Sequence, residues 1–216
     1  MPDIFDEVAE DLRSDRNHAL LRRYGGVALL ALVLIVAGVG GWEVWRQAAH
    51  GRSDSEATQY LAAQTLADGA QNGRLDALPG FGKIADAAGP GYRTLARLRE
   101  AALQADAGKL PDALGLWDKI AADGGADPIL RDFANLQWAL HQIDAGEPGL
   151  VSARLLPLTG DDSVWRPLAQ EGQAMLAMRQ GNTEAARDTL RRLAADNTAP
   201  DGVRGRANGL LQRLGG

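Results

Sequence analysis

The chain has 216 residues, a formal net charge of −5 and no cysteine, which excludes a disulfide framework, thiolate metal ligands and a cysteine nucleophile. Residues 1–45 contain four basic and seven acidic residues, and residues 46–216 contain nineteen and twenty-one. Neither part therefore has the basic surface that nucleic-acid binding needs.

The first predicted element is a short amphipathic helix in a cytoplasmic tail over residues 1–23. Ile4, Phe5, Val8 and Leu12 follow helical spacing and form one apolar edge. The tail is either solvated or a docking helix for a cytosolic partner or for the membrane surface. Its six acidic residues argue against anionic lipid as the docking surface.

A long apolar run follows, over residues 24–42. Its nineteen residues carry no charge, and a helix rising about 1.5 Å per residue would make them about 28 Å long, close to the ~30 Å hydrocarbon core of a bilayer. Aromatic residues stand where the lipid headgroups would lie. We therefore predict a transmembrane helix over residues 24–45. The predicted membrane-interface anchors are Arg22, Arg23, Tyr24, Trp42 and Trp45.

Two other interpretations of the apolar run are a buried core helix and a cleaved signal peptide. Against cleavage, the 23 residues before the run are too long for an ordinary n-region, and no clean A-x-A site follows. Four arginines lie in the fifteen residues before the run and two in the fifteen after it. The positive-inside rule therefore places the N-terminus in the cytoplasm and residues 46–216 outside it.

The remaining sequence is rich in helix formers and repeats itself. Glycines at positions 73, 108, 146 and 181 each separate two apolar helical stretches, and their spacings are 35, 38 and 35 residues. Four kinds of position agree across the last three units. They are Ala101, Ala139 and Ala174; Ala113, Val151 and Ala186; Trp117, Leu155 and Leu190; and Ile120, Leu158 and Leu193.

This repeat predicts a stack of helical hairpins. Small residues let two antiparallel helices approach, glycine marks the turn, and a proline at position 128, 167 or 200 stops the second helix or starts the next. One hairpin cannot bury its own apolar stripe, so hairpins stack into a solenoid that residues 200–214 would cap. Around Gly73, Pro79-Gly80 and Gly82 interrupt the pattern.

A glycine, an alanine five residues later, a large apolar residue four further on and a closing proline resemble the tetratricopeptide repeat. The start DIFDEVAEDLR, Arg23-Tyr24-Gly25 before the span and Gly41-Trp42-x-x-Trp45 at its end resemble the single-pass ancillary subunits of the bacterial Sec translocon.

The predicted fold class is all-α, with a single N-terminal transmembrane helix followed by a tetratricopeptide-like helical-hairpin solenoid over residues 46–216. The resemblance further implies an inner-membrane anchor held in lipid by one span and a periplasmic repeat domain. It also implies partners among SecYEG translocon subunits, periplasmic chaperones and exported polypeptides.

The sequence contains no constellation of residues for catalysis or for a cofactor. Residues 80–85 match G-x-G-x-x-A, but no strand precedes them and Pro79 indicates a turn. His18, His50 and His141 lack the spacing of zinc ligands. We therefore expect no enzymatic activity, metal, cofactor, small-molecule substrate or nucleic-acid partner.

A solenoid binds proteins through its concave face, and the first helices of the hairpins here carry two candidate stripes. The more apolar stripe, expected to pack between helices, comprises Leu98, Ala102, Ala105, Leu136, Leu140, Ile143, Met175 and Met178. The other is the candidate protein-binding groove: Arg99, Leu103, Gln137, His141, Leu176 and Arg179. A register error of one residue would exchange the two stripes.

These features predict a membrane-tethered periplasmic scaffold that binds proteins at or near the Sec translocon and assists the handling of exported proteins, with chaperone partners. Tethering raises the effective concentration of the binding surface at the membrane without requiring high affinity. The alternative is a structural adaptor for envelope assembly or cell division that binds one fixed partner.

Overall fold

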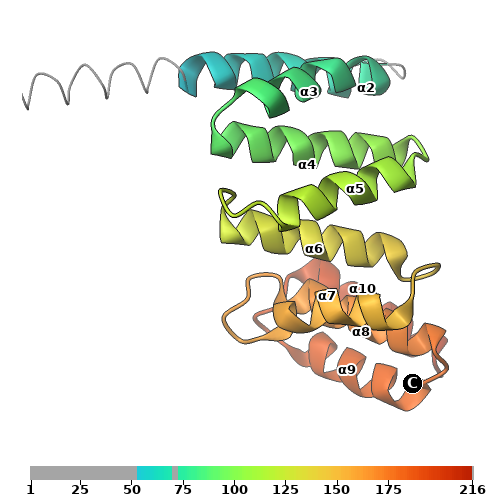
Figure 1. Cartoon of the computed structure of the whole chain (residues 1–216). Helices are drawn as coiled ribbons and strands as arrows, with labels where there is room; N and C mark the ends of the chain where they lie inside the picture. The colour runs from blue at the N-terminus through green and yellow to red at the C-terminus, as the bar shows by residue number, and fades with distance from the viewer. Residues whose placement is uncertain (1–52, 70–72, 216) are drawn as a thin grey trace, which may run out of the picture. The chain divides into compact units, whose positions relative to one another are not determined.

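The computed structural model describes residues 53–69 and 73–215, and the regular elements of these residues are all helical (Figure 1). The predicted tail, the predicted transmembrane helix over residues 24–45 and all five interface anchors lie outside the described residues and stay predictions. None of the described helices is both long and apolar enough to cross a membrane.

The chain divides into two compact units, Met1–Ser55 and Glu56–Gly216, and the second contains the repeats. A helix over residues 53–68 comes first among the described elements. The elements after it are α2 (Gly73–Asp76), α3 (Leu78–Ala87), α4 (Pro90–Asp106), α5 (Leu110–Ala121), α6 (Pro128–Gln142), α7 (Pro148–Leu155), η1 (Leu156–Thr159), α8 (Arg166–Arg179), α9 (Thr183–Ala195) and α10 (Asp201–Arg213).

From α3 to α9 the helices stack in chain order, and α10 packs back against α9 and α8 (Figure 1). Each helix from α3 to α9 packs mainly against the helices before and after it, and α8 also touches α6 and α10. Packing between sequence neighbours is the organisation of a solenoid built from helical hairpins. The predicted helical-hairpin solenoid is therefore confirmed for the described residues.

All twelve repeat positions identified in the sequence are buried, with exposed fractions of 2% or less. The repeat position in the first helix of each hairpin is always alanine: Ala101, Ala139 or Ala174. Ala101 of α4 shares a core cluster with Ala113 of α5. Small side chains at both positions let the two helices approach closely. A larger side chain would not fit between them, because the core is close-packed. The same cluster holds Trp117 and Ala134, so it also joins α5 to α6.

Gly73 is the first residue of α2, whereas glycine occupies the turn of each later hairpin, for two different reasons. Gly108 and Gly181 follow α4 and α8 in the left-handed region, each with a φ of 76°, where a side chain is strained. Gly146 has no positive φ, but a Cβ added there would come within 2.8 Å of the backbone oxygen of Gln142. The predicted role of these glycines as turn residues is confirmed.

The prolines of the repeat begin helices. Pro128 is the first residue of α6, Pro167 is the second of α8, and Pro200 directly precedes α10. Proline suits this place because its missing N–H would have no partner within the first turn of the helix. Of the two roles predicted for these prolines, the structure shows that they start the next helix.

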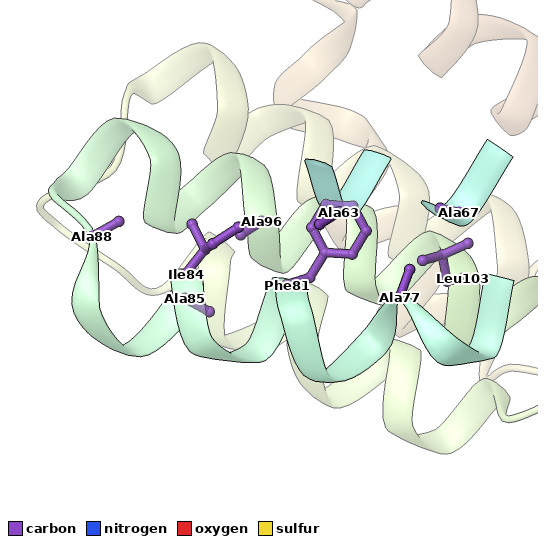
Figure 2. Close-up of a cluster of buried hydrophobic side chains, with 9 residues drawn as sticks. All are labelled: Ala63, Ala67, Ala77, Phe81, Ile84, Ala85, Ala88, Ala96 and Leu103. Atoms are coloured by element: carbon purple, nitrogen blue, oxygen red, sulfur yellow. The ribbon is translucent and has the colours of Figure 1, made fainter. Parts of the chain in front are cut away.

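The turn expected at Pro79 is wrong, because Pro79, Gly80 and Gly82 all lie within α3. Pro79 lies in the first turn of α3, and the fully buried Phe81 packs among alanines of the first helix and of α4 (Figure 2). A Cβ at Gly80 would lie 3.3 Å from the Cβ of Ala63, so glycine allows a close approach there. The G-x-G-x-x-A match therefore lies within a helix rather than in a phosphate-binding loop.

The C-terminal helix α10 covers the last hairpin, as predicted. Its buried or partly buried residues on the cluster shared with α8 and α9 are Val203, Ala207, Leu210 and Leu211, followed by Leu214. Arg206 of α10 also reaches α8, where its Nε and Nη2 atoms donate to the two carboxylate oxygens of Glu171, each at 2.6 Å. This bidentate pair fixes the cap at a defined place on the stack.

Candidate functional site

A hollow of about 250 Å³ lies between α4 and α6, with α5 behind it. We refer to it as the α4–α6 hollow. Its lining residues are Leu98, Ala102, Asp106, Trp117, Phe133, Gln137 and His141. The hollow is thus built from two first helices of neighbouring hairpins and from the second helix that connects them.

The two first helices each contribute one side chain per turn. In α4 these are Leu98, Ala102 and Asp106, four residues apart, a spacing that places them on one face of the helix. Phe133, Gln137 and His141 follow the same spacing in α6. Both rows run from apolar to polar towards the helix C-terminus, so the hollow has an apolar end and a polar end.

Trp117 of α5 forms the floor of the hollow. Its side chain is only 2% exposed and occupies a repeat position, which fixes it in the core. The centroids of the Trp117 and His141 rings are 4.6 Å apart, and the rings are tilted by 38°. Because Trp117 is almost completely buried, the aromatic area that a bound segment can cover comes from the partly buried Phe133.

His141 offers a hydrogen-bond acceptor at the polar end. Its Nδ1 atom lies 2.8 Å from the carbonyl oxygen of Gln137. Because a carbonyl oxygen only accepts, Nδ1 carries the proton in this arrangement, and in the neutral ring Nε2 is left as an acceptor. The local bond follows from helical spacing, since residues four apart are neighbours on the helix surface.

The apolar end continues towards α8. The rings of Phe133 and Trp165 lie 4.8 Å apart, and the Trp165 indole N–H donates to the carbonyl oxygen of Ile129 at 3.0 Å. Beside them Ile129 is 50% exposed and Val164 is 66% exposed. The hollow therefore has an apolar margin that a bound segment can cover.

The polar end is electronegative. None of the seven lining residues is lysine or arginine. Asp106 lies 4.0 Å from Arg74, but both side chains are more than half exposed, so this ion pair is weak. Asp106 is the last residue of α4 and His141 lies in the last turn of α6, where the helix dipole adds partial negative charge.

Two of the six predicted groove residues, Gln137 and His141, line the α4–α6 hollow. Leu103 and Leu176 instead belong to the core, with exposed fractions of 2% and 4%, so their prediction as groove residues is wrong. Both are held inside the stack because they sit on the flank of their helix that faces a neighbouring hairpin.

The other two predicted groove residues are tied to neighbouring helices. Arg99 donates to Asp68 at 2.9 Å, near the end of the first helix. The Nη1 atom of Arg179 donates to the carbonyl oxygens of Ile143 and Gly146, each at 2.7 Å, and thereby satisfies the end of α6. These two arginines join adjacent repeats, and the structure does not bring them to the hollow.

The sequence placed Leu98 and Ala102 in the stripe expected to pack between helices. Asp106, Trp117 and Phe133 were not predicted as groove residues, and Trp117 was identified only as a repeat position. The hollow lies between two helices, so each contributes the flank that faces the other. These flanks are not equivalent repeat positions, and an alignment of repeats cannot pair them. Each flank could have been recognised from the sequence as three residues spaced four apart that run from an apolar to a polar side chain: Leu98, Ala102 and Asp106 in α4, and Phe133, Gln137 and His141 in α6.

A second hollow of about 360 Å³ lies between α4 and α5. Its lining residues are Glu100, Gln104, Pro111, Asp112, Gly115, Leu116 and Lys119. It has no aromatic side chain and carries charges of both signs, so it offers less apolar surface for a protein segment. Within the described part of the chain, no three His, Asp or Glu side chains gather as a metal site would require.

A family model described as a tetratricopeptide repeat-like domain matches residues 19–206. No curated protein and no solved structure matches the chain. The match covers most of the sequence and agrees with the stacked hairpins, the buried repeat positions and the glycine turns described above. The chain therefore belongs to the family of tetratricopeptide repeat-like domains.

Proposed function

We propose that this chain is a membrane-tethered scaffold that binds protein segments in the α4–α6 hollow. In this proposal the repeat unit lies on the periplasmic side of the inner membrane, at or near the Sec translocon. There it assists the handling of exported proteins together with periplasmic chaperones.

The protein-binding part of the proposal is supported by the family and by the hollow. Tetratricopeptide-like domains generally serve as protein-interaction scaffolds. The single observation that carries the proposal is the aromatic floor and apolar margin of the hollow, with Trp117, Phe133 and Trp165 held in place by their neighbours. Interfaces draw much of their binding energy from aromatic side chains that become buried on binding, and Phe133 and Trp165 are only partly buried in the free chain.

The location is supported by the sequence. The uncharged run over residues 24–42 has the length of a membrane span, and more arginines precede it than follow it. The resemblance to single-pass ancillary subunits of the Sec translocon, which residues 3–45 and the repeats after them carry, supports the choice of partner.

Photocrosslinking from the hollow tests the proposal. A photoreactive phenylalanine analogue is introduced at position 137 of the full chain, and crosslinked proteins are identified from membranes of the native cells. The control places the analogue at Asp188, an exposed residue of α9 whose side chain is 61% exposed. We expect translocon subunits, periplasmic chaperones or exported proteins to be crosslinked from position 137 and not from position 188.

Equal crosslinking from the two positions, or none to envelope proteins from position 137, would contradict the proposal. Recovery of one stoichiometric envelope-assembly or division protein from position 137 would favour the structural adaptor instead.

A further inference from the structure

We propose that the α4–α6 hollow selects extended protein segments in which a lysine or arginine stands two residues from an apolar side chain. The apolar side chain enters between Leu98 and Phe133, and the basic side chain reaches Asp106 at the polar end. This inference rests on the proposed function, that the hollow binds protein, and specifies the chemistry of the segment bound.

The size of the hollow favours side chains of a short segment. Its volume of about 250 Å³ lies below the roughly 300–1,000 Å³ of sites that enclose drug-sized ligands. A helix, which is about 10–12 Å across with its side chains, does not fit into such a space. Individual side chains of an extended chain do fit, with the backbone crossing the rim.

The spacing of the lining residues favours one apolar and one long basic side chain. Leu98 and Asp106 are eight residues apart in α4, so their Cα atoms are about 12 Å apart along the axis. In an extended segment, side chains two residues apart point the same way and are about 6.6 Å apart. The flexible stem of lysine or arginine covers the remaining distance and lies along apolar surface as it does so.

Charge complementarity favours a cation at the polar end. The hollow contains the Asp106 carboxylate and the acceptor nitrogen of His141, and no lining residue is basic. The C-terminal turns of α4 and α6 add partial negative charge to the same place. An acidic segment would meet repulsion there, and the exposed Arg74 at 4.0 Å is too weakly paired to prevent exchange of partners.

Peptide binding to the purified full chain tests this inference. The probe is a fluorescein-labelled peptide of sequence Gly-Ser-Leu-Ser-Lys-Ser-Gly, and binding is followed by fluorescence anisotropy. Its comparison peptides carry acetyl-lysine or glutamate in place of the lysine, or serine in place of the leucine. We expect the glutamate and acetyl-lysine peptides to bind about fivefold more weakly than the probe, with a difference that shrinks as salt is added.

Variants of the chain separate charge from apolar contact. Asp106→Asn should bind the lysine and glutamate peptides equally, and Asp106→Lys should prefer glutamate. The matched control Asp112→Asn removes an exposed carboxylate of α5 that lies in the second hollow and should keep the preference for lysine. Ala102→Trp fills the hollow and should lose all peptides, while circular dichroism checks that it remains helical.

Equal affinity of the native chain for the lysine and glutamate peptides would overturn the inference. Binding of no peptide, or an unchanged preference in Asp106→Asn, would overturn it as well. The crosslinking test distinguishes these failures from failure of the proposed function, because position 137 would then still capture envelope proteins without regard to their charge.

Discussion

At the scale of single residues, glycine should have opposite effects on the stability of the fold at Gly181 and at Gly115. Gly181 has a φ of 76°, whereas Gly115 lies inside α5, where an added Cβ would meet nothing within 4 Å. Gly181→Ala should therefore destabilise by about 1–2 kcal/mol. Gly115→Ala should stabilise by about 0.5–1 kcal/mol, because alanine favours a helix interior. Thermal unfolding followed by circular dichroism measures both, and shifts of the same sign would contradict this account of the turn.

Glu100 gives the chain a pH dependence of stability. Burial, with a smaller contribution from the negative charge of Asp86, raises the pKa of the Glu100 carboxyl above its ordinary value of 4.5, against the opposing effects of Lys119 and Arg97. The folded state therefore disfavours the ionised carboxylate. Well below pH 4.5 the carboxyl is protonated in both states and has no effect, and the penalty develops as pH rises from 4.5 through the raised pKa.

The variant Glu100→Gln should accordingly be more stable than the native chain at neutral pH. The gain should fade as pH falls towards 4.5, because the native carboxyl is then neutral as well. Urea unfolding of both chains across this pH range measures the difference in the free energy of unfolding. A gain that does not change with pH would show that packing of the amide, and not removal of a charge, is its cause.

At the scale of elements, the attachment of α10 depends on the pair between Glu171 and Arg206. The Glu171 side chain is 6% exposed and receives two hydrogen bonds from Arg206, which is itself 54% exposed. Arg206→Ala leaves a buried carboxylate without its partner, and we expect a loss of about 2 kcal/mol. Hydrogen exchange should show α10 amides opening before those of α4 and α6.

The double variant Glu171→Leu with Arg206→Met serves as the control. Replacing both members of a buried pair with apolar residues of similar size is often nearly neutral. We therefore expect the double variant to recover most of the stability that Arg206→Ala loses. Equal losses in the two variants would mean that α10 is held by its apolar residues alone.

The helices of the repeated hairpins, and the residues that they bury, could be predicted from the sequence. Ala139, Val151 and Leu155 belong to a three-fold pattern, and burial of the repeat positions follows from it. Pro79 was interpreted as a turn but lies in the first turn of α3, where the tertiary contact of Phe81 with neighbouring alanines outweighs the low helix propensity of Gly80 and Gly82. Such a contact between residues of different helices cannot be recognised from the local sequence.

The hollow was predictable only in part for a different reason. Gln137 and His141 were found because they remain on a first helix once its more apolar stripe is assigned to packing between helices. Asp106 and Trp117 reach the same place from two other helices, and their meeting depends on how hairpins are offset in the stack. Repeat alignment compares equivalent residues, whereas a site between repeats joins residues that are not equivalent.

At the scale of the whole molecule, the proposed function depends on residues 24–45 holding the repeats at a membrane. Attachment to the same membrane raises the effective concentration of a partner, so weak binding in the hollow is sufficient. Exchanging residues 24–45 for a polar linker should therefore move the chain to the soluble fraction and lower crosslinking from position 137. Exchange for an unrelated membrane span should restore both, because the proposal assigns the segment an anchoring role without sequence-specific contacts.

The same proposal predicts the topology of the chain. Alkaline phosphatase, which is active only outside the cytoplasm, should be active when fused after residue 216 and inactive when fused within residues 1–23. Replacing Arg22 and Arg23 with glutamate should weaken this orientation, since those residues contribute half of the four arginines before the apolar run. An active fusion at the N-terminus of the native chain would place the α4–α6 hollow in the cytoplasm, where it would not meet periplasmic chaperones or exported proteins.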